Sequence, residues 1–433
     1  NAVTAPMFAL FTNSKGEEIK METEPLTNYN IIVLDQALKN RSSISFTNTN
    51  VIRNGSGRDA NVSALDVSLF DKKNNYNLRL QGRFSHVTGA DPHDGFKTIV
   101  NFQKISGKWQ WGAFNNIESK QYDPNDLGIL RSPNEFTTGA YISFNQFTPN
   151  KHFNFRNYNL SITQSNLFEP FLFQNIQYES RFLHVFKNFW DLSLELQGSP
   201  VWGFDYFDLR TDGRKVKKVP YHFIGFFGST DSRKKLFLNY GLGFAESPLP
   251  KDPFYLWSVG ARYRFNPKFS LDFNLRREID NGNLGYAYRN SFGEPIYGRR
   301  NLKNYNTVVN FLYNFKARMN LSFRARHFWS NVNYTNFYTV QESGEWRNTE
   351  IAFSKNYDGN FNAFNIDAFY TWDFKPGCRF IAAWKNALGP DVYLDGIMNS
   401  KFGQNISKVL SSPHSNEVSF RFIYFIDYNK LKK

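Results

Sequence analysis

The chain has 433 residues and a formal net charge of +14, and it combines 46 Phe, 23 Tyr and 9 Trp with a mean hydropathy of only −0.52. This pairing disfavours a soluble protein, in which exposed aromatics would cause aggregation, and favours a barrel that places them against lipid and at both membrane interfaces. No run of about 18 apolar residues occurs, which excludes a helical membrane span and leaves a closed barrel as the spanning structure.

The 52 basic residues are spread along the chain instead of forming blocks, so the charge does not indicate a nucleic-acid partner. Anionic lipid, an anionic solute or soluble loops account for it more simply. The single cysteine, Cys378, excludes an intramolecular disulfide framework. The first residues lack the basic head and apolar run of a signal peptide, so we expect an exported chain whose leader is not part of this sequence.

Period-two alternation of apolar and polar side chains recurs along the whole chain and predicts strands with one apolar and one polar face. In 76–84, for example, Leu78 and Leu80 alternate with Arg79 and Gln81. The clearest hairpin joins the alternating runs 258–265 and 269–276 through 266–268, a connection short enough for a tight turn.

The last alternating run, 417–428, gathers aromatic side chains on one face. We expect the barrel-assembly machinery to recognise this terminal strand, although residues 429–433 displace the signal from the very end of the chain. The candidate assembly-signal residues are Phe420, Phe422, Tyr424, Ile426 and Tyr428.

Connections alternate between short and long, as periplasmic turns and external loops do in outer-membrane barrels. Nine hairpins, a first strand up to about Phe11 and a last strand over 416–428 predict about 20 strands, within a range of 18 to 22. We therefore expect one all-β domain over 1–433, a transmembrane antiparallel barrel with both termini periplasmic. The short turns are expected near 37–41, 72–75, 106–108, 149–151, 184–188, 231–234, 266–268, 314–316 and 375–377, and the long loops at 118–136, 199–220, 277–302, 330–360 and 387–415.

Motifs that could carry chemistry are explained as well by turns and strands. The segment 55–60 has the letters of a dinucleotide fingerprint, but a strand pattern follows it instead of the helix that would meet a pyrophosphate. The acidic residues of 91–94 and 123–126 could bind calcium, although Asp, Pro and Asn also favour tight turns. The seven histidines have no zinc-ligand spacing. We expect no catalytic residues, no cofactor and no metal site.

The predicted inward faces carry scattered charges. They suit a channel wall or a docking surface for an internal plug that favours anionic groups. The alternative is an ion-pair network that only holds a wide barrel in shape. The candidate lumen-lining residues are Arg79, Arg83, Arg262, Arg264, Arg276, Arg324, Arg326, Asp272 and Asp367, and the candidate membrane-interface aromatics, four of them tryptophans close to short turns, are Trp109, Trp190, Trp372, Trp384, Tyr424 and Tyr428.

Seven segments carry a likeness to a known family: 24–30, 57–62, 122–128, 298–300, 323–329, 365–372 and 423–428. Over its whole length the chain resembles the C-terminal barrel region of a Bacteroidota outer-membrane family of unknown function. Members of that family usually carry an N-terminal β-sandwich similar to family 9 carbohydrate-binding modules. The resemblance implies an outer-membrane location and a barrel fold, but no reaction or ligand, and it implies that a periplasmic sandwich and further strands precede Asn1.

The first functional hypothesis is a non-enzymatic outer-membrane barrel that acts as a transport channel or as a scaffold in a complex, with a link to glycan handling. The alternatives are a membrane-embedded hydrolase with a Ser-His-acid cluster at one rim and a soluble all-β binding protein such as a propeller. A TonB-dependent transporter is disfavoured because no plug-like domain precedes the strands. Expected partners are outer-membrane lipid and lipopolysaccharide, the assembly machinery during insertion, and other outer-membrane proteins or lipoproteins, with no nucleic acid.

Overall fold

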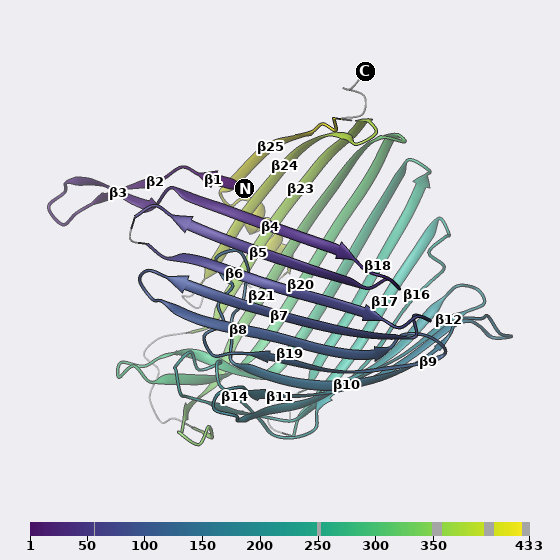
Figure 1. Cartoon of the computed structure of the whole chain (residues 1–433), viewed down its shortest axis with the longest axis horizontal. Helices are drawn as coiled ribbons and strands as arrows, with labels where there is room; N and C mark the ends of the chain where they lie inside the picture. The colour runs from purple at the N-terminus through teal and green to yellow at the C-terminus, as the bar shows by residue number, and fades with distance from the viewer. Residues whose placement is uncertain (56, 249–252, 349–356, 394–401, 427–433) are drawn as a thin grey trace. The chain divides into compact units, whose positions relative to one another are not determined.

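The computed structural model is all-β, as the sequence predicts, and it describes residues 1–55, 57–248, 253–348, 357–393 and 402–426. Most strands pair antiparallel with a neighbour along the chain in one 21-stranded sheet (Figure 1), and four others form two separate two-stranded sheets. The chain forms two compact units, one of 1–147, 157–180 and 199–204, the other of 148–156, 181–198 and 205–433.

The first unit contains a ladder in which each strand from β4 to β10 pairs with the next, with β1 paired to β4 and β2 paired to β3 in a separate sheet. Its strands are β1 (Ala2–Thr4), β2 (Met7–Thr12), β3 (Glu18–Glu24), β4 (Thr27–Ala37), β5 (Ser43–Arg53), β6 (Asp59–Phe70), β7 (Tyr76–Thr88), β8 (His93–Lys104), β9 (Trp109–Glu118) and β10 (Glu135–Gln146). The strands β11 (Phe153–Leu167), β12 (Phe173–Phe186) and β13 (Asp191–Ser199) contribute residues to both units, and β14 (Gly203–Asp205) follows them.

The second unit contains the longest strands and the one helix among the described residues. Its elements are β15 (Val216–Lys218), β16 (Tyr221–Ser229), β17 (Leu236–Glu246), β18 (Phe254–Asn266), β19 (Phe269–Arg289), β20 (Pro295–Lys316), β21 (Met319–Val340), β22 (Trp346–Asn348), β23 (Gly359–Lys375), β24 (Cys378–Tyr393), α1 (Phe402–Leu410) and β25 (His414–Ile423). No helix of the described residues is long and apolar enough to cross a membrane.

Seven of the nine short turns lie where the sequence predicts them, while those predicted at 184–188 and 314–316 lie two to three residues later, at 187–190 and 317–318. A side chain at the start of the turn often fixes its geometry. The amide of Asn266 accepts hydrogen bonds from the backbone N–H groups of Lys268 and Phe269 at 2.8 and 2.9 Å. Asp71 binds the N–H groups of Asn75 and Tyr76 in the same way. Asn and Asp favour turns because they can bind their own backbone a few residues on, so these positions set the hairpin register.

Two predicted long loops are wrong, because strands continue through most of each. β19 and β20 extend into 277–302 and leave only residues 290–294 between them, while β21 and β22 occupy much of 330–360. These segments are rich in Asn, Tyr and Gly, so the apolar alternation fades although the backbone pairing continues. A prediction that rests on side-chain alternation cannot see such a strand.

The two ends of the chain also differ from expectation. The first strand was expected up to about Phe11, but β1 ends at Thr4 and pairs with β4, and β2 and β3 form a separate hairpin. The predicted loop 387–415 contains the end of β24 and the helix α1. Asn405 and Val409 of α1 are fully buried, and the Asn360 amide donates a 3.0 Å hydrogen bond to the Asn405 side-chain oxygen.

Candidate functional site

Side chains with unusual environments gather where the segment 199–220, which links β13 to β16, meets the far ends of β19 to β22. Leu209 and Val216 of this segment are completely buried against Tyr297 and Tyr338, with Val340 beside them. The packed cluster contains only apolar and aromatic side chains, so it holds the segment through burial of apolar surface. We call residues 205–218 the strap.

Backbone and side-chain hydrogen bonds fix the strap to the tip of the β21–β22 hairpin. The Lys217 N–H donates to the Gly344 carbonyl at 2.8 Å, and the Trp346 indole donates to the Lys217 carbonyl at 3.3 Å. Gly344 has a φ of +89° at this tip, a backbone conformation that residues with a Cβ rarely adopt. The glycine conformation at the hairpin tip and these two hydrogen bonds therefore hold the strap in place.

A charged group lies inside this junction. The Lys218 ammonium donates to a carboxylate oxygen of Asp208 at 2.5 Å and to the Tyr297 hydroxyl at 3.0 Å. Burial alone lowers the pKa of Lys218, but the neighbouring Tyr297 and Asp208 outweigh it and raise the pKa above its usual value. Burial raises the pKa of Tyr297 to about 12. At neutral pH the junction therefore contains an ammonium and a neutral phenol.

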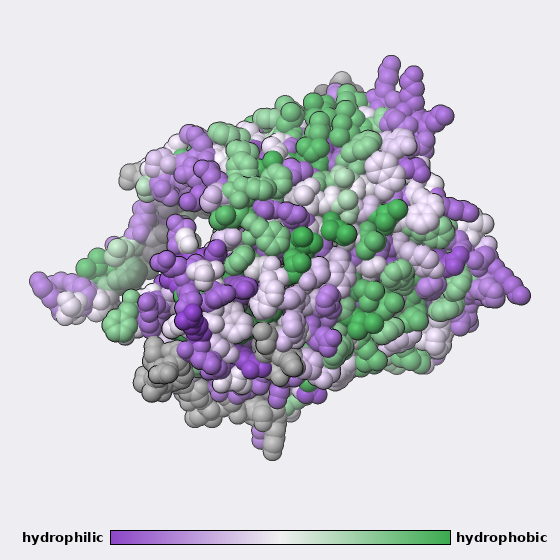
Figure 2. Space-filling view, turned by 90° about the horizontal axis from the view of Figure 1, so that it is seen from below, coloured by the Kyte–Doolittle hydropathy of each residue, from purple (hydrophilic) through white to green (hydrophobic). Residues whose placement is uncertain are grey.

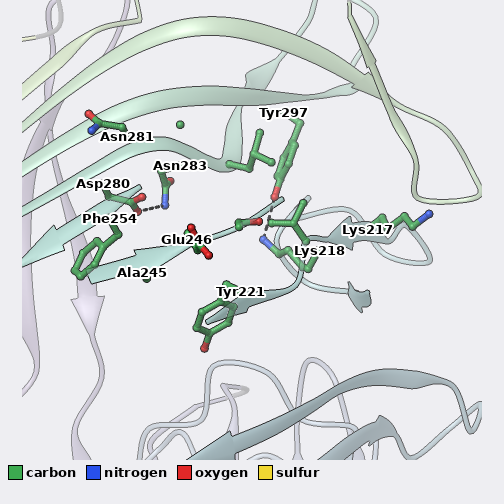
Figure 3. Close-up of a pocket in the computed structure, with 14 residues that line it drawn as sticks. Lys217, Lys218, Tyr221, Ala245, Glu246, Phe254, Asp280, Asn281, Asn283 and Tyr297 are labelled. Atoms are coloured by element: carbon green, nitrogen blue, oxygen red, sulfur yellow. Dashed lines mark hydrogen bonds between the residues drawn. The ribbon is translucent and has the colours of Figure 1, made fainter. Parts of the chain in front are cut away.

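A cavity of about 250 Å³ opens beside this junction (Figure 3). Its lining includes Lys218 and Tyr297 from the junction, Glu246 from the end of β17, and Asp280 and Asn283 from β19. The Asn283 amide donates a 2.7 Å hydrogen bond to the Asp280 carboxylate, and Figure 3 shows Glu246 directed toward the space between Asp280 and Lys218.

A β-bulge shapes this wall of the cavity. The register of β19 against β20 shifts between Asp280 and Asn283, and Gly282 in the bulge has a φ of +70°. A bulge redirects the side chains on either side of it and is common beside functional sites. The bulge therefore accounts for the presence of both Asp280 and Asn283 in the lining.

A second ionic cluster joins the connections of the first unit. Arg58 binds Asp123 at 2.6 Å and Asp126 at 2.9 Å, and Arg53 binds Asp126 at 2.8 Å. Burial alone raises the pKa of Asp126, but hydrogen bonds from Arg58 and Arg53 outweigh it and keep the pKa below its usual value. Guanidinium groups neutralise these carboxylates, which argues against calcium at 123–126. No three His, Cys, Asp or Glu side chains form a metal-binding group in the part of the chain that the structure describes.

We predict that Arg58→Met will loosen the connection 119–134 and raise its cleavage rate by chymotrypsin roughly tenfold, because Asp126 keeps only Arg53 as a cationic partner. The stabilisation from Asp126 is complete above the ordinary carboxyl pKa of about 4 and is lost as the pH falls through the lower folded value. Acid should therefore open the connection in the native protein and change the variant less. Arg131→Met, in the same connection, is the matched control, and an equal response of both variants would contradict the assignment.

The predicted lumen-lining residues lie on the polar faces of their strands, but in separate groups. Arg262 is opposite Asp272 across β18 and β19, with Arg264 and Arg276 along the same face, and Arg276 pairs with Glu278 at 2.7 Å. Arg262 and Arg264 also donate to the carbonyl of Ser232, in a short turn. The remaining members follow the same rule, with Arg324 opposite Asp367, Arg326 opposite Asn365, and Arg79 and Arg83 on the face of β7 that carries the buried Asn77 and Gln81.

The predicted interface tryptophans are exposed, and three of them lie close to short turns. Trp109 begins β9, Trp190 directly precedes β13, and Trp372 is near the end of β23. Trp384 lies well inside β24 instead, where its indole donates to the Asn416 side chain at 3.1 Å. Their role at a membrane interface remains a prediction.

The candidate assembly-signal residues lie on or just after β25. Phe420 and Phe422 are 72% and 66% exposed on one face of the strand, and the exposed Tyr424 and Ile426 follow its end. Tyr428 lies outside the described residues. The N–H of Phe425 donates to the sulfur of the buried Cys378 at 3.3 Å, so this cysteine helps to position the residues that directly follow β25 next to β24.

The comparisons with known proteins give a family and no activity. The family described as "Domain of unknown function (DUF5916)" matches residues 1–433. No curated protein matches the chain.

Proposed function

We propose, for a chain that belongs to this family over its whole length, that the sheet closes into an integral outer-membrane β-barrel of the Bacteroidota. The barrel acts without chemistry, as a conduit for solutes or as a scaffold for partner proteins at the cell surface. The observation that carries the proposal is the apolar face that the strands leave uncovered.

β17 shows this face most clearly. Its alternate residues from Leu236 to Phe244 are all large and apolar, and Glu246 follows them at the end of the strand. The opposite face is smaller and more mixed, with Phe237, Asn239, Gly241, Gly243 and Ala245. Water would make such a strand unstable, but lipid is a favourable solvent for it. The uncovered residues, between 37% and 61% exposed, are Leu236, Leu238, Tyr240, Leu242 and Phe244. Figure 2 shows that hydrophobic residues also form broad patches on the surface.

Strand length supports the same proposal and adds a feature. About 9 to 11 residues suffice for a tilted strand to cross a bilayer, but β19, β20 and β21 have 21, 22 and 22 residues. Roughly half of each strand would then project into water beyond the bilayer. The strap, the cavity and the polar residues of 277–302 belong to that projecting half.

The test is membrane extraction followed by conductance of the full chain in a planar bilayer. We expect the protein to resist alkaline washing, to require detergent for extraction, and to give discrete conductance steps if it is a conduit. Extraction without detergent would contradict the barrel. A detergent-dependent protein without conductance would retain the barrel and select the scaffold.

A further inference from the structure

We propose that the cavity beside the strap binds one ring of a sugar that carries no negative charge. This inference goes beyond the proposed function and does not depend on it, because the cavity is built entirely within the second unit. It follows from three properties of the lining: its size, its balance of charge, and its combination of hydrogen-bonding groups with an aromatic wall.

Size limits the ligand. A cavity of about 250 Å³ is smaller than the roughly 300 to 1,000 Å³ typical of sites for drug-sized molecules. It can admit one six-membered ring with its substituents, and a longer chain would have to extend out of the opening. The site therefore selects a single ring or the end of an oligomer.

Charge excludes an anionic ligand. The Lys218 ammonium is paired with Asp208, and Lys217, which Figure 3 shows directed away from the cavity, lies 3.6 Å from Glu345. Neither lysine is left to attract an anion. An anionic ligand would add a charge that no cation of the lining is free to neutralise, and burying an unpaired charge is costly.

A chain of two hydrogen bonds links Asp280 to the guanidinium of Arg300. The Arg300 guanidinium donates to the Asn283 side-chain oxygen at 2.9 Å, and the Asn283 amide donates to one oxygen of Asp280 at 2.7 Å. Glu246 is exposed, so water screens its charge. The two carboxylates retain lone pairs that can accept hydrogen bonds without needing a counter-ion.

The arrangement of groups matches a sugar more closely than other neutral polar molecules. Asp280 and Glu246 accept from hydroxyls, while Phe254 offers an apolar wall to the C–H face of a ring. A site that is built to hydrogen-bond hydroxyl groups discriminates strongly against rings that lack them. The bulge at Gly282 accounts for this geometry, because it redirects Asp280 and Asn283 in the middle of a strand.

The experiment measures binding to the full chain in detergent by saturation-transfer NMR. The neutral probes are the methyl glycosides of glucose, galactose, mannose and N-acetylglucosamine, and the charged probe is glucuronate. We expect at least one neutral ring to bind with a dissociation constant on the order of 1 mM, and glucuronate to bind at least tenfold more weakly. Asp280→Ala should weaken the neutral ring at least tenfold, and Phe254→Leu should weaken it several-fold.

Glu278→Gln is the matched control, because it changes a carboxylate of the same strand that pairs with Arg276 outside the cavity. We expect it to leave binding unchanged. Tighter binding of glucuronate, no saturation by any neutral ring below about 100 mM, or equal weakening by Asp280→Ala and Glu278→Gln would each overturn the proposal. Binding is measured in detergent, so the outcome is independent of whether the barrel conducts ions.

Discussion

Replacing Lys218 with Met is expected to release the strap and to raise its cleavage rate by chymotrypsin roughly 10- to 100-fold. The variant leaves Asp208 and the Tyr297 hydroxyl without their cationic partner. Breaking one side of a buried pair costs about 3 to 5 kcal/mol, and since the Lys218 side chain is 36% exposed we reduce this to about 1 to 3 kcal/mol. The cleavage rate of a segment that opens locally depends on the free energy of opening. It rises tenfold for each loss of about 1.4 kcal/mol.

The control for this prediction is Asp212→Asn, a charge change at an exposed position of the same strap. It should leave cleavage at Tyr206 and Phe207 at the native rate. If Lys218→Met is cleaved no faster than the control, the apolar contacts of Leu209 and Val216 hold the strap without the ionic group. If cleavage spreads to β16 and β17, the substitution has disturbed the sheet and not the strap alone.

The sequence predicts the structure near the short turns much better than it predicts the opposite ends of the strands. Near the turns, strong alternation and the turn residues, such as Asn266 and Asp71, give both the strands and their connections. Farther along β19 to β21 the alternation fades, and the prediction fails although the strands continue. Backbone hydrogen bonds hold these extensions, and such bonds leave little trace in side-chain chemistry.

The candidate site could not be predicted because its parts come together only in the folded chain. Lys218 and Tyr297 are far apart in sequence, and neither belongs to an alternating run that marks one of them as a partner of the other. The arginine residues that the sequence did single out are held largely by local contacts, such as Arg276 with Glu278 and Arg262 with a turn carbonyl. A faint signal was available in Asn281-Gly282, since a glycine within a strand often marks a bulge.

The largest expected effect concerns the uncovered face of β17. Leu242→Arg, near the middle of this strand, is expected to destabilise the folded protein by about 2 to 4 kcal/mol, because an arginine at the bilayer midplane loses its hydration. Leu236→Arg, on the same face but at the first residue of the strand, should cost only about 0 to 1 kcal/mol, since the penalty falls toward the interface. Urea denaturation in lipid vesicles measures both free energies of unfolding. The folded fraction is read from gels, as the fraction of protein whose mobility still changes on heating.

The comparison of these two variants separates lipid from water as the solvent of this face. Leu242 is 61% exposed and Leu236 is 49% exposed, so in water either substitution would replace an exposed apolar side chain with a soluble one. Such changes are usually within about 0.5 kcal/mol. Equal and small effects would therefore identify an aqueous face and contradict the barrel. The two substitutions are chemically identical and differ only in their depth along one strand. A uniform solvent does not explain a large difference between their effects, so such a difference requires a bilayer.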